Sequence, residues 1–171
     1  KANSATKFVI PAPEIACLTA CGIPMERIIP AVAFAPIRLA GFCITPIPAA
    51  HETLQPDANG NYPALGYIIQ TKDKTFFHAG DMCMYDGLIE SLQPFSVDVA
   101  LLPINGRDYF RTKNDIIGNF NCEEAVLLAK AISADLLVPL HHDLYAINRV
   151  RTACFVDAVE QLDSRRKYHI F

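Results

Sequence analysis

The sequence predicts a mixed α/β (α+β) fold arranged as one domain over residues 1–171. Short apolar runs of strand length alternate with segments of helical periodicity, and after residue 90 the order becomes β-α-β-α-β. A chain of 171 residues with 51% hydrophobic residues is large enough to enclose one core. No repeat, low-complexity segment or linker divides the chain, so a single domain is expected.

The first elements are a short strand and a helix. Residues 7–13, KFVIPAP, are apolar and of strand length. A helix is predicted over 14–21 because Pro13 suits a first helical turn, and Gly22 is suited to end it.

The next part of the chain is rich in β-forming residues. Residues 65–71 and 74–80 are two apolar runs around the polar KDK, which predicts a hairpin. Residues 57–63, DANGNYP, form a turn cluster before it. The segment 28–51 is expected to form only short edge-type strands or bent turns, because proline interrupts it at positions 30, 36, 46 and 48.

The second half alternates strands with helices. Strands are predicted at 97–104, 135–142 and 167–171, the first of them a continuous apolar run. A helix is expected to start at Asn121, because an acid follows the cap residue three positions later, and to continue to about Ser133. A last helix is expected over about 149–164.

The charge balance limits the classes of partner. The formal net charge is −3 and no long basic run occurs, so nucleic-acid binding is not expected. The longest apolar runs are broken by proline or charge well short of a membrane span, and no cleavable leader is visible. The six cysteines form no C-x-x-C pair and are expected to be reduced apolar side chains. A cytoplasmic protein acting on a small molecule is therefore expected, with no membrane contact.

Candidate metal ligands stand at the ends of three predicted strands. His51 follows the β-rich segment, Asp81 follows the hairpin on a glycine turn, and His141 ends the strand 135–142. Imidazole and carboxylate at neighbouring strand ends are ligands that zinc or manganese prefers. Any one of these histidines alone would be better explained as a structural residue, but three equivalent positions together favour a divalent metal site.

Further residues are candidates for contacting substrate. Asn105, Arg107 and Arg111 cluster in a loop after a strand, where an arginine could meet an anionic group, although local ion pairs would explain them equally well. His142 follows the candidate ligand but should point to the opposite face of the strand. It is expected either near the substrate or at the surface. Tyr85 is a weaker candidate for substrate binding.

The order of His51, HAGD at 78–81, LLPINGRD at 101–108 and VPLHHD at 138–143 resembles the metallo-β-lactamase superfamily, in the branch of L-ascorbate-6-phosphate lactonase. The resemblance implies an αββα sandwich. It also implies that His51 ligates a first metal, that Asp81 bridges two metals as the main catalytic residue, and that His141 ligates the second. The cations would lower the pKa of a shared water, which attacks an ester, lactone or phosphoester.

The main motif of that superfamily, H-x-H-x-D-H, is absent, since no histidine precedes His51. We therefore expect the C-terminal portion of a longer protein or a truncated product, with an incomplete metal site and little activity alone. A sheet without its partner sheet exposes apolar residues. Self-association, or association with the missing N-terminal half, is expected for this reason.

The resemblance predicts a metal-dependent hydrolase of a lactone or phosphorylated small molecule. A non-catalytic subunit or binding domain that needs a partner chain is the alternative. A nuclease or phosphodiesterase is less favoured because the chain is acidic.

Overall fold

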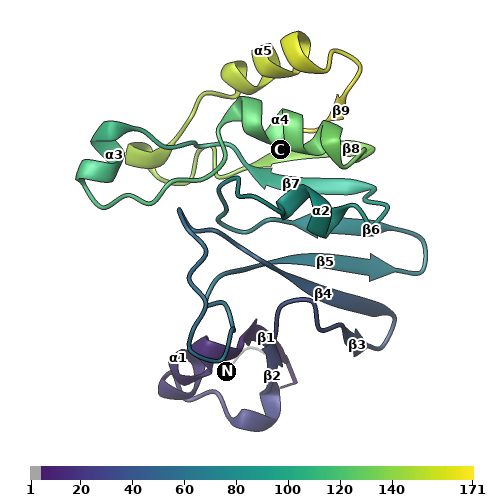
Figure 1. Cartoon of the computed structure of the whole chain (residues 1–171), viewed down its shortest axis with the longest axis vertical. Helices are drawn as coiled ribbons and strands as arrows, with labels where there is room; N and C mark the ends of the chain where they lie inside the picture. The colour runs from purple at the N-terminus through teal and green to yellow at the C-terminus, as the bar shows by residue number, and fades with distance from the viewer. Residues whose placement is uncertain (1–4) are drawn as a thin grey trace.

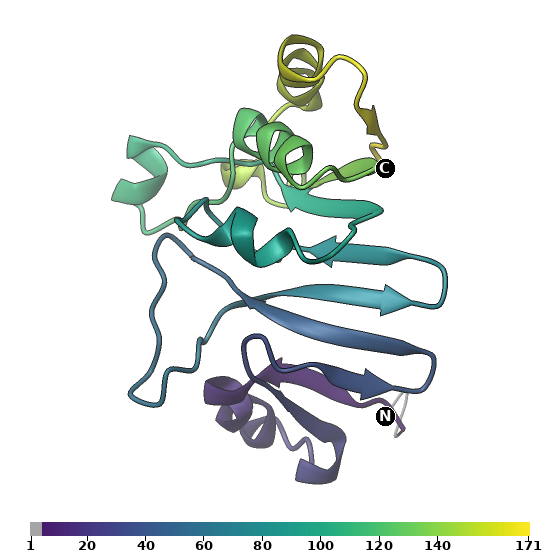
Figure 2. The same ribbon diagram turned by 45° about the vertical axis from the view of Figure 1, so that its right-hand side comes forward.

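A computed structural model describes residues 5–171, so residues 1–4 of the predicted domain lie outside the described residues (Figure 1). Within the described part, a seven-stranded sheet has the order β3-β4-β5-β6-β7-β8-β9 (Figure 2). The strands β3 to β6 pair antiparallel and β6 to β9 pair parallel. The strands are β3 (Ile37–Leu39), β4 (Phe42–Pro48), β5 (Leu65–Thr71), β6 (Thr75–His78), β7 (Val99–Pro103), β8 (Leu136–Leu140) and β9 (Lys167–Tyr168).

The first residues form a separate small unit beside this sheet. β1 (Phe8–Pro11) pairs parallel with β2 (Ile28–Ala31), and the helix α1 (Ile15–Ala20) connects them together with the single turns η1 (Ala12–Glu14) and η2 (Met25–Arg27). The predicted strand and the helix after Pro13 are therefore confirmed, with a 3-10 turn between them.

The strand β4 corrects the prediction for residues 28–51. It is seven residues long and lies between β3 and β5, although it contains Pro46 and Pro48. Both prolines lie beyond the end of β3, whose pairing with β4 stops at Ile44. Their carbonyls accept hydrogen bonds from outside β5: the Phe34 N–H donates to Pro46 at 2.8 Å, and a tyrosine hydroxyl donates to Pro48. The missing N–H groups thus face away from β5, where no ladder bond is lost.

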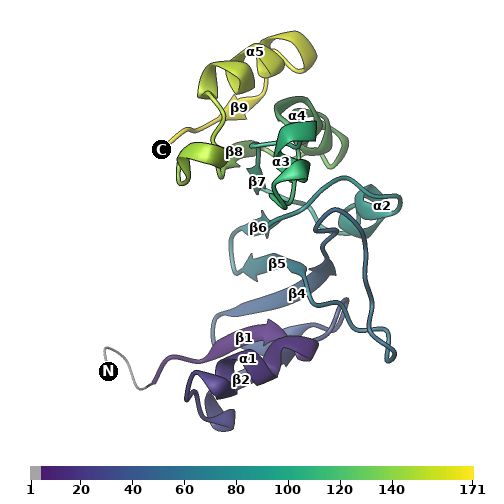
Figure 3. The same cartoon turned by 90° about the vertical axis from the view of Figure 1, so that its left-hand side faces the viewer.

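Helices cover one face of the sheet and enclose the core. In Figure 3, α2 (Leu88–Leu92), α3 (Tyr109–Lys113) and α4 (Cys122–Ala131) lie on the same side of the strands. α5 (Thr152–Leu162) packs on α4, and the turn η3 (Ala146–Asn148) precedes it. The largest fully buried side chains between these layers include Phe77, Leu102, Phe120, Leu137 and Phe155. The mixed α/β class is confirmed.

The N-terminal cap of α4 is the one that the sequence predicts. Asn121 accepts a hydrogen bond from the Glu124 N–H, and the Glu124 carboxylate accepts one from the Asn121 N–H, which is a complete capping box for α4. The last helix is shorter than the predicted 149–164, and the closing strand is limited to β9 instead of 167–171.

The opposite face of the sheet is less well covered. Ile69 of β5, Phe76 of β6 and Leu101 of β7 point there and are only half-buried, whereas Ile68 and Phe77 on the helical face are fully buried. Among the described helices, α2, α3 and α4 are all on the other side (Figure 3). Across residues 5–171, no helix is long and apolar enough to cross a bilayer.

Candidate metal centre

The three candidate ligands lie just beyond the ends of β4, β6 and β8. The first two loops are held together, because Cys83 and Ala50 form a β-bridge in which the Cys83 N–H donates to the Ala50 carbonyl at 2.8 Å. The Phe120 N–H donates to the Met82 carbonyl at 2.8 Å and fixes the second loop to the segment before α4. These backbone bonds place His51 and Asp81 at the same edge of the sheet.

Asp81 lies between the two candidate histidines. Its Oδ1 is 3.1 Å from Nε2 of His141, and its Oδ2 is 3.8 Å from Nε2 of His51. The prediction that the three residues lie close together is confirmed. All three side chains are accessible to solvent, with Asp81 43% exposed. A ligand can therefore reach the donor atoms from outside.

The backbone adopts the left-handed region at or beside each of the three residues. The φ angle is +71° at Glu52, which follows His51, +66° at Gly80, which precedes Asp81, and +56° at His141 itself. Only glycine adopts this region without a steric cost. Backbone strain of this kind concentrates at binding and catalytic sites, where it aims side chains. At His141 it ends β8 and turns the imidazole toward Asp81.

A glycine in β5 makes room for the Asp81 loop. A Cβ atom at Gly66 would lie 2.9 Å from the Met82 Cε and 3.0 Å from the Ala79 carbonyl oxygen. The Met82 side chain could move aside, but the backbone contact is tighter than most in folded proteins, so a larger residue would require the loop to shift by a few tenths of an ångström. The signal in the sequence is a glycine inside a strand, which often marks the close approach of another backbone.

His78 positions the turn before Asp81. Its Nδ1 accepts a hydrogen bond from the Gly80 N–H at 3.0 Å. Burial, and then the nearby His141, lowers the pKa of His78, so the ring is neutral near pH 7 and able to accept this bond.

Tyr85 supports the loop that leads to His51. Its hydroxyl donates to the Pro48 carbonyl at 2.7 Å, and burial raises the pKa of Tyr85 to about 12. A substrate contact by Tyr85 stays a prediction, while its observed partner gives it a positioning role.

The donor set suits a borderline divalent ion in kind, since it combines two imidazole nitrogens with a carboxylate. Each oxygen of Asp81 faces a different histidine, an arrangement that suits a carboxylate shared between two metal ions. Within residues 5–171, however, no group of three or more His, Cys, Asp or Glu side chains is arranged so that it could hold a metal ion. The three residues therefore suit a metal by their chemistry, but in this arrangement they do not form a three-ligand site by themselves.

A pocket of about 330 Å³ opens beside His51. Glu52 lines it and no lysine or arginine does, so it offers no counter-charge to an anion. The remaining lining residues are Ala49, Thr53, Gln55, Pro63, Ala64 and Ile117.

The predicted substrate arginines have partners within the protein. Arg107 forms two hydrogen bonds to the Glu124 carboxylate, at 2.6 and 2.9 Å, and donates to the Asn119 carbonyl. Arg111 pairs with Asp108 at 3.1 Å and donates to the Asn105 carbonyl. Their role as substrate contacts stays a prediction, but neither guanidinium is unpaired.

Asn105 is buried beneath these arginines. Its Oδ1 accepts from Asn119 Nδ2 at 3.0 Å, and its own Nδ2 has no described hydrogen-bond partner. The sequence pointed to this loop but not to Glu124 as the residue that neutralises it, although the capping box had drawn attention to that carboxylate.

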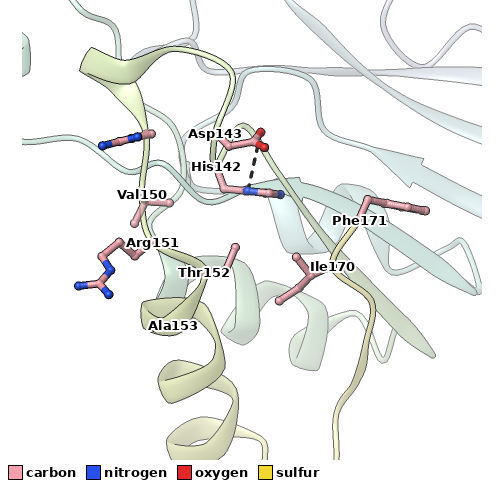
Figure 4. Close-up of a pocket in the computed structure, with 9 residues that line it drawn as sticks. His142, Asp143, Val150, Arg151, Thr152, Ala153, Ile170 and Phe171 are labelled. Carbon is pink, nitrogen blue, oxygen red and sulfur yellow. Dashed lines mark ion pairs between the residues drawn. The ribbon is translucent and has the colours of Figure 1, made fainter.

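His142 points away from the Asp81 side. Its Nδ1 lies 3.8 Å from Asp143 Oδ1, and its side chain lines a pocket together with Ile170 and Phe171 (Figure 4). The expectation that consecutive histidines face different directions agrees with this geometry. β8 ends at Leu140, one residue before His141, so the divergence arises from the turn and not from a regular strand.

Comparison with known proteins gives the family. The model of the β-lactamase superfamily domain matches residues 5–142. A metal-dependent hydrolase from Methanoculleus marisnigri is 29% identical over 133 residues, which is 76% of this chain and 55% of that protein. The chain spans about half the length of the curated relatives it matches.

Solved structures share the fold. The metallo hydrolase Igni18 from Ignicoccus hospitalis superposes with a TM-score of 0.72 at 24% identity, over 96% of this chain and 65% of that one. The metallo-β-lactamase fold protein YhfI from Bacillus subtilis gives a TM-score of 0.64 at 17% identity, over 92% and 59%. The expected fold is thus confirmed. Since the family model covers most of its length, this chain belongs to the metallo-β-lactamase superfamily.

Proposed function

We propose that this chain supplies His51, Asp81 and His141 as ligands to a divalent metal centre, zinc or manganese, of a hydrolase. The proposed substrate is a lactone or a phosphorylated small molecule, as in the L-ascorbate-6-phosphate lactonase branch. The observation that carries the proposal is the position of Asp81, whose two carboxylate oxygens face different imidazoles at 3.1 and 3.8 Å. The relatives named as metal-dependent hydrolases support it.

A divalent ion held there would act as a Lewis acid and lower the pKa of water. The chain's own contribution is to hold the donors. His78 and Gly80 fix the turn that presents Asp81, and Gly66 leaves room for it. Asp81 lies between the two Nε2 atoms, where a carboxylate would offset the charge of cations brought there.

The pocket beside His51 supports an uncharged reacting group. Glu52 is its charged lining residue, so a lactone or ester carbonyl fits better there than a phosphate. An anionic group on the substrate would have to bind elsewhere. We keep a cytoplasmic location as part of the proposal, because all six cysteines are free thiols.

A second candidate is a subunit that needs another chain to complete the site. The chain spans about half of its relatives' length, and no group of three or more metal-ligating side chains among the described residues could hold an ion by itself. Ile69, Phe76 and Leu101 on the less covered sheet face would pack against a partner, either another copy or a chain carrying the remaining half. Light scattering after size exclusion should show a species larger than a monomer. A stable monomer would contradict the association.

Metal titration tests the ligand assignment. In calorimetry with zinc or manganese, the chain should bind one ion weakly, and Asp81→Asn and His141→Gln should each weaken binding by at least about tenfold. Asp143→Asn is the matched control, because Asp143 is exposed and contacts His142 on the other side. Equal affinity of Asp81→Asn and the unmodified chain would refute the assignment. Hydrolysis of lactones or phosphodiesters by the chain alone should be negligible.

A further inference from the structure

Two cysteines of the small N-terminal unit are exposed on the same helix. Cys17 lies in α1 and Cys21 directly follows it, and both are free cysteines exposed to solvent. Free cysteine is among the most buried residue types, and the chain buries Cys83 and Cys122 in this ordinary way. A packed apolar face, the usual explanation for two cysteines four positions apart on a helix, therefore does not account for this pair.

The helical turn brings the two side chains together. The Cys21 N–H donates to the Cys17 carbonyl at 3.3 Å, so an i to i+4 bond spans the pair. Residues at this spacing lie on one face of a helix, with about 5–6 Å between their Cβ atoms. Leu18, by contrast, is half-buried. The two thiols thus share one solvent-facing side of the turn.

The spacing favours a bridging ion over a disulfide. A disulfide requires Cβ atoms about 3.5–4.5 Å apart, so closing one between Cys17 and Cys21 would distort the turn. Two metal–sulfur bonds of about 2.3 Å each span roughly 4.5 Å between the sulfur atoms. The turn can provide this separation without moving its backbone.

The number of donors selects the kind of ion. In the part of the chain that the structure describes, no group of three or more His, Cys, Asp or Glu side chains is arranged to hold a metal ion, so Cys17 and Cys21 offer two ligands without a third. Zinc prefers four ligands in structural sites. Soft thiolate ligands select Cu(I), which forms stable complexes with only two of them.

Glu14 makes the site more selective. The Cys17 thiol donates a hydrogen bond to Glu14 Oε2 at 3.2 Å. This hydrogen bond, and then the charge of the carboxylate, raises the pKa of Cys17, so the group is a protonated thiol near pH 7. An entering ion has to displace that proton, which favours ions with a strong affinity for sulfur.

We infer that Cys17 and Cys21 form a two-thiolate binding site for a soft monovalent cation of the Cu(I) type, separate from the candidate metal centre. Binding forms two copper–sulfur bonds, breaks two S–H bonds and releases two protons to solvent, with no change in oxidation state. The inference does not rest on the proposed function, since none of His51, Asp81 and His141 belongs to the unit of β1, α1 and β2. Figure 1 shows this unit at the end of the molecule opposite to α5.

Competition with a colorimetric Cu(I) chelator under anaerobic conditions tests the inference. The reduced 171-residue chain should take up Cu(I) and release two protons per ion, measured in weakly buffered solution. Alkylation followed by mass spectrometry should show that Cu(I) protects both Cys17 and Cys21. Zinc at the same concentration should protect neither, because two of its four preferred ligands are missing.

Variants locate the site. Cys17→Ser and Cys21→Ser should each weaken binding of the first Cu(I) by at least about tenfold. Ala16→Cys combined with Cys17→Ser is the matched control, because Ala16 is exposed and the change keeps the number of exposed thiols while moving one off the shared face. It should bind as weakly as Cys17→Ser. Cys154→Ser removes an exposed thiol elsewhere and should change the affinity by less than about twofold.

Three outcomes would overturn the inference. The first is that the unmodified chain does not hold Cu(I) against the chelator. The second is an unchanged affinity in both serine variants. The third is an affinity of the variant with the displaced thiol equal to that of the unmodified chain, which would mean that any two exposed thiols suffice. Thermal unfolding of each variant, within a few degrees of the unmodified chain, confirms that the fold is retained.

Discussion

Two clusters of charged residues follow neighbouring strands of the sheet, and they use their polar groups differently. After β7, Arg107 forms two short bonds to Glu124, the same carboxylate that caps α4. After β6, Asp81 contacts His51 and His141 at 3.8 and 3.1 Å, with its side chain 43% exposed. In the first cluster, Arg107 and Glu124 find their hydrogen-bond partners within the protein. The second leaves most of its hydrogen-bonding capacity unused.

Whether a polar side chain is fully bonded within the protein distinguishes structural residues from binding residues better than its residue type does. An arginine and an aspartate in loops at the same sheet edge were both plausible site residues from the sequence. In the Arg107 cluster the bonds hold α4 and the loop 105–108 together, and breaking them costs stability. In the Asp81 cluster the backbone at His141 has a positive φ, and the donor atoms of all three side chains are open to solvent.

The largest expected effect comes from Gly118, which makes room for Arg107. A Cβ atom there would lie 2.3 Å from the Arg107 Cβ, so Gly118→Ala must displace Arg107 and its bonds. We expect a loss of about 3 kcal/mol in the free energy of unfolding, measured by urea denaturation. Repeating the change in an Arg107→Gly background removes the clash and should cost far less. An equal cost in both backgrounds would argue against this mechanism.

Breaking the Arg107 cluster directly should have the next largest effect. Arg107→Gln removes the charged partner of Glu124 and should lower the free energy of unfolding by about 2 kcal/mol. The exposed Arg165, which has no described partner, provides the control Arg165→Gln, expected to stay within about 0.5 kcal/mol. If the two substitutions cost the same, the cluster does not stabilise the fold as we describe.

The same cluster should make stability depend on pH, with a smaller amplitude. Burial raises the pKa of Glu124, but hydrogen bonds from Arg107 and the Asn121 N–H outweigh it and the pKa is lowered from 4.5. A carboxylate with a lower pKa in the folded state stabilises the protein above the unfolded-state pKa, and this contribution is lost as pH falls through the folded-state pKa. The stability advantage over Glu124→Gln should therefore shrink between pH 6 and about pH 3. A constant difference over this range would contradict the prediction.

The smallest effect on stability is expected for Asp81. With a chelator present, Asp81→Asn should change the free energy of unfolding by less than about 0.5 kcal/mol, because its two contacts with histidine are exposed to solvent. The same urea titrations measure it beside Arg107→Gln. A loss as large as that of Arg107→Gln would make Asp81 a structural ion pair and remove the contrast between the two clusters.

The sequence predicted that the three candidate ligands lie close together, because local rules decide where the strands end. His51, Asp81 and His141 could be grouped because each follows an apolar strand, and strands of one sheet bring their ends together. The capping box of α4 and the hairpin around KDK depend on a few adjacent residues, and both are found.

Other features depend on contacts between distant residues. The partner of Arg107 lies 17 positions away, so the sequence left its role open between substrate and ion pair. α3 was treated as a loop because five residues show no helical period, although Asp108 caps it by accepting from the Phe110 and Arg111 N–H groups.

The two prolines of β4 have a consequence for the behaviour of the protein in concentrated solution. Beyond Ile44, β4 has no strand on its outer side, and such an open margin is where a second chain can add a strand and start a fibril. Pro46 and Pro48 present no N–H groups there, and their carbonyls are already occupied by Phe34 and Tyr85. An incoming chain would find neither donors nor free acceptors at these positions. The feature that seemed to argue against a strand thus protects it from templated aggregation.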